Sequence, residues 1–149
     1  MYGPLRDLFI HILDYPASDV DIDVTGEGGR PDVTVRAPSG LLDGKGRPAK
    51  IDWIVVEAKD EPNCFRVEAS RESIFAKKAK YVGANTAWFM MVEPTVIVLR
   101  AVSTSVSGDA DVVIPLDTTT EAEFRHLTLA LHASKAGVSL QLERFRAGD

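Results

Sequence analysis

Two acids and one lysine stand near the ends of two neighbouring β-like runs of this sequence. Asp32 opens the run PDVTVRAP, and Glu57 and Lys59 lie near the end of the next run, KIDWIVVEAKD. Because side chains alternate in direction along a strand, Glu57 and Lys59 are expected to point to the same face. If the two runs pair, Asp32 lies across from Glu57. Carboxylates beside an amine can hold a hard divalent cation next to a phosphate, which is chemistry suited to phosphodiester hydrolysis.

The run that carries Glu57 is predicted to be a central strand of a sheet. Its apolar residues form two sets, with Ile51, Trp53 and Val55 on the expected face of Glu57 and Lys59, and Ile54, Val56 and Ala58 on the opposite face. A strand that is apolar on both faces is normally covered by helices on both sides. Charged side chains on such a strand carry a desolvation cost unless they pair, bind a metal or reach a water-filled cleft. A solvated ion pair at an exposed strand end is the alternative, but we favour a functional site because buried charge marks such sites.

Hydrophobic periodicity and turn residues predict the other elements. We expect helices over about 4–14, 66–82 and 120–134, and strands over 19–25, 86–92 and 95–102. The glycines of residues 26–29 predict a hairpin turn, and the segment 38–50 is expected to form an irregular loop or an extended hairpin. With the two runs around the acids, the order is helix, three strands, helix, two strands, helix. This order predicts an α/β fold, an α+β arrangement with a central mixed sheet flanked by helices.

Composition limits the class of protein. The 149 residues, 45% hydrophobic and 26% charged, suit one domain with a single core. No apolar run approaches the roughly 20 residues that cross a membrane, and the start lacks the layout of a signal peptide, so we expect a cytoplasmic protein with no membrane partner. The single cysteine, Cys64, cannot form an internal disulfide, and the three histidines show no zinc-ligand spacing with it. Neither glycine-rich segment has the spacing of a phosphate-binding loop, which argues against an NTPase of that class.

The charge of the chain argues against a simple nucleic-acid binder. The net charge is -5, whereas a domain that holds DNA electrostatically is usually basic on at least one face. The segment from Arg66 to Lys80 is locally basic, with five lysines and arginines against two glutamates. This surface could face phosphate, or it could be an ordinary solvated helix face.

Taken together as Pro31-Asp32 followed by Glu57-Ala58-Lys59, these residues resemble the active-site motif of the PD-(D/E)XK nuclease superfamily. With GEGGRPDVTVRAP, WIVVEAKDEP and KKAKYVGANTAWFMMV, they make about residues 1–102 similar to the nuclease-type domain at the N-terminus of restriction-modification enzymes fused to DNA methyltransferases. The resemblance implies a restriction-endonuclease-like core and a Mg²⁺-dependent DNA endonuclease, a hydrolase acting on phosphodiester bonds. It also implies that residues 1–149 form a single nuclease-like domain, the N-terminal part of a longer polypeptide.

The resemblance assigns roles to the motif residues. Asp32, Glu57 and the backbone carbonyl of Ala58 would hold Mg²⁺, for which Mn²⁺ could substitute. Lys59 would orient or help deprotonate the attacking water and offset negative charge in the transition state.

Two positions depart from the family pattern. Many members carry an additional acid on the first helix, for which Asp7 and Asp14 are the candidates in this chain. Some members place a glutamine four residues before a tyrosine on the next helix, whereas Lys77 precedes Tyr81 here. Lys77 and Lys78 are therefore candidates for phosphate contact.

The implied partner is double-stranded DNA. An attached or associated methyltransferase or target-recognition domain would supply the DNA affinity that an acidic domain lacks, and a homodimer would supply two sites for a double-strand break. Two other classes stay open. One is a catalytically inactive nuclease-fold module that binds DNA or a partner protein, with its acids and lysine splayed or paired only with each other. The other is a protein-interaction or immunity-type domain, favoured by the acidic charge and the apolar strands over 86–102.

Overall fold

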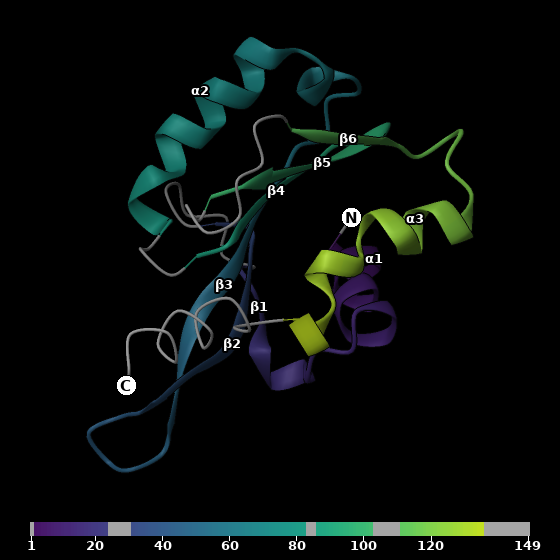
Figure 1. Cartoon of the computed structure of the whole chain (residues 1–149). Coiled ribbons are helices and arrows are strands. Elements are labelled where there is room, and N and C mark those ends of the chain that lie inside the picture. Colours follow the sequence, from purple (N-terminus) through teal and green to yellow (C-terminus); the bar gives the residue numbers. More distant parts are fainter. Residues whose placement is uncertain (1, 24–30, 83–85, 103–110, 136–149) are drawn as a thin grey trace.

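A computed structural model describes residues 2–23, 31–82, 86–102 and 111–135, whose helices and strands form three layers (Figure 1). The central sheet has the strand order β1-β2-β3-β4-β5-β6. Its strands are β1 (Val20–Ile22), β2 (Val33–Leu42), β3 (Pro48–Ala58), β4 (Trp88–Val92), β5 (Val96–Ala101) and β6 (Val112–Pro115). β3 and β4 run parallel, and all other neighbours are antiparallel. The predicted mixed sheet is confirmed.

Helices cover both faces of the sheet. α2 (Glu68–Lys78) lies over one face, and α1 (Tyr2–Asp7) and α3 (Glu121–Leu127) lie over the other (Figure 1). α1 continues as a π-helical segment, Leu8–Ile12, and short 3-10 helices follow at Ala17–Asp19, Cys64–Arg66, Ala79–Tyr81, Leu129–Leu131 and Ala133–Lys135. α2 connects β3 to β4, which is the kind of crossover that parallel neighbours require.

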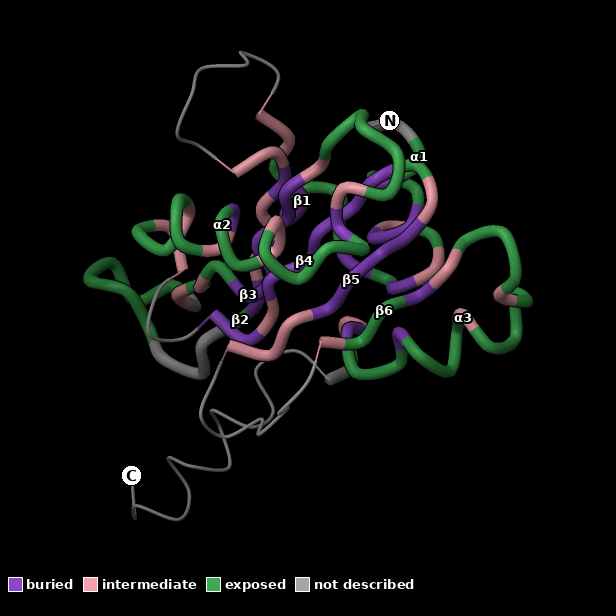
Figure 2. The backbone as a smooth tube through the Cα atoms, turned by 90° about the horizontal axis from the view of Figure 1, so that it is seen from above, coloured by how far each residue is buried: buried purple, intermediate pink, exposed green. Residues whose placement is uncertain are grey.

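Each face of the sheet has its own apolar cluster. The α2-face cluster consists of Val55, Phe65, Ile74, Phe89, Met91, Val96 and Val98. The α1/α3-face cluster is larger and includes Leu5, Leu8, Phe9, Leu13, Val33, Val35, Ile54, Val56, Met90, Leu99 and Leu131. Figure 2 shows the buried strands at the centre and the exposed outer sides of the helices around them. The prediction that the strand ending at Glu57 is central and buried on both faces is therefore confirmed.

A β-bulge at Trp53 changes which residues of β3 share a face. The pairing of β2 with β3 shifts between Val35 and Arg36, which leaves Trp53 as an extra residue. Ile51 and Trp53 therefore pack in the α1/α3-face cluster, and Val55 packs in the α2-face cluster. The prediction that these three residues share a face was wrong, because strict alternation does not account for an inserted residue.

The other predicted elements are present, with different bounds. The helix over 4–14 becomes α1 followed by its π-helical segment, the helix over 66–82 is α2 flanked by 3-10 turns, and the helix over 120–134 breaks after Leu127. The segment 38–50 forms an extended hairpin, since β2 runs to Leu42 and β3 begins at Pro48. The predicted turn at 26–29 lies outside the described residues, although the strands it would join do pair antiparallel. β6 was not predicted.

Within the described ranges, no helix combines the length and the apolar character needed to cross a bilayer.

Tyr15 connects the N-terminal helices to the 3-10 segment after α3. Its buried hydroxyl donates a hydrogen bond of 2.6 Å to the carbonyl of Leu131, and burial raises the pKa of Tyr15. We expect Tyr15→Phe to lower the free energy of unfolding by about 1–3 kcal/mol, because a buried carbonyl loses its donor. Urea unfolding measures the change. Tyr81→Phe is the control, since Tyr81 is only half-buried, and an equal loss in both variants would contradict the role of the Tyr15 hydrogen bond.

Candidate functional site

The two acids of the motif lie side by side at one end of β2 and β3. Asp32 directly precedes β2, Glu57 is the last residue but one of β3, and the pairing of Val33 with Val56 places the two acids opposite each other. The backbone N–H of Asp32 donates to the carbonyl of Val56 at 3.1 Å. Its Oδ2 accepts a hydrogen bond of 2.7 Å from the N–H of Ala58. The structure therefore brings Asp32 and Glu57 together and fixes the Asp32 carboxylate.

Glu57 is a buried carboxylate whose nearest cation comes from α2. It is 2% exposed, and its Oε1 lies 3.3 Å from Lys78 Nζ. Among the described residues this buried oxygen accepts no hydrogen bond, so the contact is an ion pair without hydrogen-bond geometry. Burial and the neighbouring charge of Asp32 raise the pKa of Glu57 to about 7, while Lys78 and Lys59 act in the opposite direction. Glu57 therefore changes charge near neutral pH, as carboxylates at functional sites often do.

Lys59 lies beyond the strand end and is exposed. It lines a pocket of about 350 Å³ together with Lys77 of α2. The two lysines proposed for phosphate contact therefore lie in different places, because Lys77 faces this pocket and Lys78 contacts Glu57. No sequence pattern indicates the contact between Lys78 and Glu57, because it depends on how α2 lies over the sheet.

Neither candidate for the additional acid joins the pair. Oδ1 of Asp7 lies 3.8 Å from Nε2 of His11, and Oδ2 of Asp14 lies 2.9 Å from Nε2 of His132. In the part of the chain that the structure describes, no group of three or more histidine, cysteine, aspartate or glutamate side chains could hold a metal ion. Each of these two acids has a histidine partner of its own, so the described site contains two carboxylates and no third.

The oxygen atoms at the acid pair are of the kind that hard cations prefer as ligands. Asp32 and Glu57 supply adjacent carboxylates, and among the described residues the buried Oε1 of Glu57 has the Lys78 ammonium beside it as an ion pair. The Ala58 N–H faces Asp32, and a strand residue directs its N–H and C=O to the same neighbouring strand, so the Ala58 carbonyl lies on the Asp32 side. Mg²⁺ is usually bound through one or two carboxylates while it keeps several waters. The competitor for this position is the ammonium group of Lys78.

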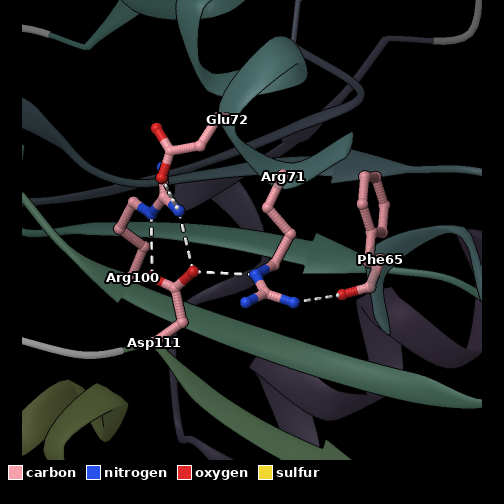
Figure 3. A network of polar contacts seen from close by, with 5 residues as sticks. All are labelled: Phe65, Arg71, Glu72, Arg100 and Asp111. Carbon is pink, nitrogen blue, oxygen red and sulfur yellow. Dashed lines mark hydrogen bonds and ion pairs between the residues drawn. The ribbon is translucent and has the colours of Figure 1, made fainter. Parts of the chain in front are cut away.

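A second polar cluster lies between α2 and the strands β5 and β6 (Figure 3). Oδ2 of Asp111 accepts hydrogen bonds from Arg71 at 2.8 Å and Arg100 at 2.7 Å, and its Oδ1 accepts one from Arg100 at 2.8 Å. Arg71 also donates to the Phe65 carbonyl, and Arg100 to Glu72. These arginines, first through the hydrogen bonds from Arg100, hold the pKa of Asp111 below its usual value. No sequence pattern predicts this cluster, because its members come from separate segments of the chain.

Comparisons with known proteins identify no relative. No family model, no curated protein and no solved structure matches this chain.

Proposed function

We propose that this protein is a divalent-metal-dependent DNA endonuclease domain, which hydrolyses phosphodiester bonds in a restriction-modification or related defence system. The observation that carries the proposal is the buried carboxylate of Glu57 beside Asp32, with Lys59 two residues further on. Two adjacent carboxylates repel each other, and burial deprives Glu57 of hydration. Binding a cation would relieve both effects.

Each residue of the site has a task in this proposal. When bound, Mg²⁺ would polarise the phosphoryl oxygen and lower the pKa of a water molecule. The carboxylates of Asp32 and Glu57 would bind the cation. The Ala58 N–H keeps the Asp32 carboxylate in place through a hydrogen bond. Lys59, which is exposed at the strand end, orients the attacking water and offsets negative charge on the phosphate.

An inactive nuclease-fold module that binds DNA or a partner protein is the second candidate. The ion pair between Lys78 and Glu57 favours it, because an ammonium group already neutralises the acid. The net charge of -5 is compatible with both candidates. In the nuclease proposal, an attached methyltransferase or target-recognition domain supplies affinity for double-stranded DNA. A homodimer supplies the second active site that a double-strand break requires.

Cleavage of supercoiled plasmid tests the proposal. At high protein concentration and low salt we expect nicking with Mg²⁺ or Mn²⁺ and none with EDTA. Asp32→Asn, Glu57→Gln and Lys59→Met should each lower the nicking rate at least about 100-fold. Asp32→Asn keeps an acceptor for the Ala58 N–H, so its loss of rate would report on charge rather than on folding.

Lys45→Met provides the matched control, since Lys45 is an exposed lysine of the β2–β3 hairpin. It removes the same charge as Lys59→Met and should retain the wild-type rate. A folded wild-type protein that neither nicks DNA nor binds Mn²⁺ by calorimetry would contradict the nuclease proposal and support the inactive module.

A further inference from the structure

Two lysines of this acidic chain line one pocket, and neither forms an ion pair with a carboxylate among the described residues. The chain has 22 aspartates and glutamates against 17 lysines and arginines. Lys50 pairs with Asp19 and Lys78 with Glu57, but no described acid lies within 4.0 Å of the ammonium group of Lys59 or Lys77. What distinguishes Lys59 and Lys77 is that both line the same pocket, which places two positive charges where an anion from outside the chain could bind.

Both polar and apolar side chains of α2 line the pocket that contains these lysines. Its volume is about 350 Å³, and Ser70, Ser73 and Lys77 line it from α2. Positions three, four and seven residues apart share one face of a helix, so these three side chains lie along one wall. Lys59 reaches the pocket from the end of β3, and Glu61 also lines it, so two positive charges face one negative charge.

We propose that this pocket binds the phosphoryl group of a nucleotide. Ammonium groups and hydroxyl groups donate hydrogen bonds to phosphate oxygens, and a phosphate monoester carries the charge that two lysines complement. The inference rests on the proposed function for its choice of a nucleotide, because Lys59 belongs to both sites. A phosphate held by Lys59 and Lys77 would position the strand next to Asp32 and Glu57.

Cys64 supplies a reporter for the test, since it lines the same pocket and is the single cysteine of the chain. Burial raises the pKa of its thiol, so alkylation by N-ethylmaleimide is followed at about pH 8.5. The ligands are inorganic phosphate, thymidine 5′-monophosphate and one oligonucleotide with and without a 5′-phosphate, each compared with chloride at equal ionic strength. EDTA is present throughout, so the result does not depend on cleavage.

We expect thymidine 5′-monophosphate to slow the alkylation several-fold. Lys77→Met and Ser73→Ala should abolish this protection, whereas Lys80→Met, which removes a lysine outside the pocket, should retain it. Protection by the 5′-phosphorylated strand and not by the 5′-hydroxyl strand would identify a strand end as the source of the phosphate. Phosphorus NMR of the monophosphate provides a second measurement if the thiol reacts too slowly.

Two results would overturn the inference. One is an unchanged alkylation rate and an unchanged phosphorus signal with every ligand, and the other is protection by inorganic phosphate alone. Protection in a protein that neither nicks plasmid nor binds Mn²⁺ would keep the phosphoryl pocket and reject the nuclease proposal. Plasmid nicking without protection of Cys64 would keep the nuclease proposal and reject the phosphoryl pocket.

Discussion

Asp111→Ala should lower the free energy of unfolding by about 3–5 kcal/mol, as measured by urea denaturation. The side chain of Asp111 is 12% exposed, and it bridges Arg71 and Arg100, whose side chains are 12% and 13% exposed. Without Asp111, the two guanidinium groups would keep only Glu72 as an ion-pair partner among the described residues. Removing one partner of a buried ion pair leaves uncompensated charge in a poorly hydrated place.

Glu72→Ala is the matched control for this prediction. It removes the other acid that contacts Arg100, but the side chain of Glu72 is 60% exposed. The expected cost is below about 1 kcal/mol, because water replaces an exposed partner. Similar losses in Asp111→Ala and Glu72→Ala would contradict the claim that burial makes the Asp111 contacts strong.

Glu57→Gln should remove a fall in stability that the wild-type protein shows as the pH rises from about 4.5 to about 7. The pKa of Glu57 is raised from 4.5 to about 7 in the folded chain, first by burial and then by Asp32. Between these values the folded chain keeps a proton that the unfolded chain has released, so the free energy of unfolding decreases with rising pH. The side chain is 3% exposed, and the full shift corresponds to about 3 kcal/mol.

Urea unfolding in EDTA at pH values from about 4 to about 8 measures this effect. The slope of the free energy of unfolding against pH is the informative quantity. Its absolute value is not, because Glu57→Gln also removes the ion-pair partner of Lys78. Lys78→Met should extend the fall to higher pH and so make the total fall larger, since Lys78 lowers the pKa of Glu57. Glu123→Gln, which changes an exposed acid of α3, serves as the control. A wild-type slope in Glu57→Gln would show that another group causes the pH dependence.

The proximity of the two acids could be predicted because it depends on local chain geometry. A hairpin whose strands begin after Asp32 and end after Glu57 places these residues opposite each other. The bulge at Trp53 does not disturb this pairing, because it lies on the far side of Glu57 from the strand end. The bulge does move Ile51 and Trp53 to the face of the sheet opposite Val55, which alternation along the sequence could not indicate.

Features that depend on packing between distant segments could not be predicted. The contact of Lys78 with Glu57 requires the position of α2 above the sheet, and neighbouring Lys77 has an equivalent sequence signal but faces the pocket. β6 has only four residues, Val112–Pro115, and follows a stretch rich in serine, glycine and aspartate. Its extended conformation is stabilised by pairing with β5, which short-range patterns do not report.

The adjacency of Lys77 and Lys78 on α2 has a thermodynamic consequence for the proposed site. A cation that binds Glu57 would displace the Lys78 ammonium from this carboxylate and leave its charge beside the pocket that Lys77 lines. Cation and anion would then bind with positive cooperativity, since each would raise the affinity for the other by the same factor. In this arrangement one turn of helix would couple the two ligands without a change of fold.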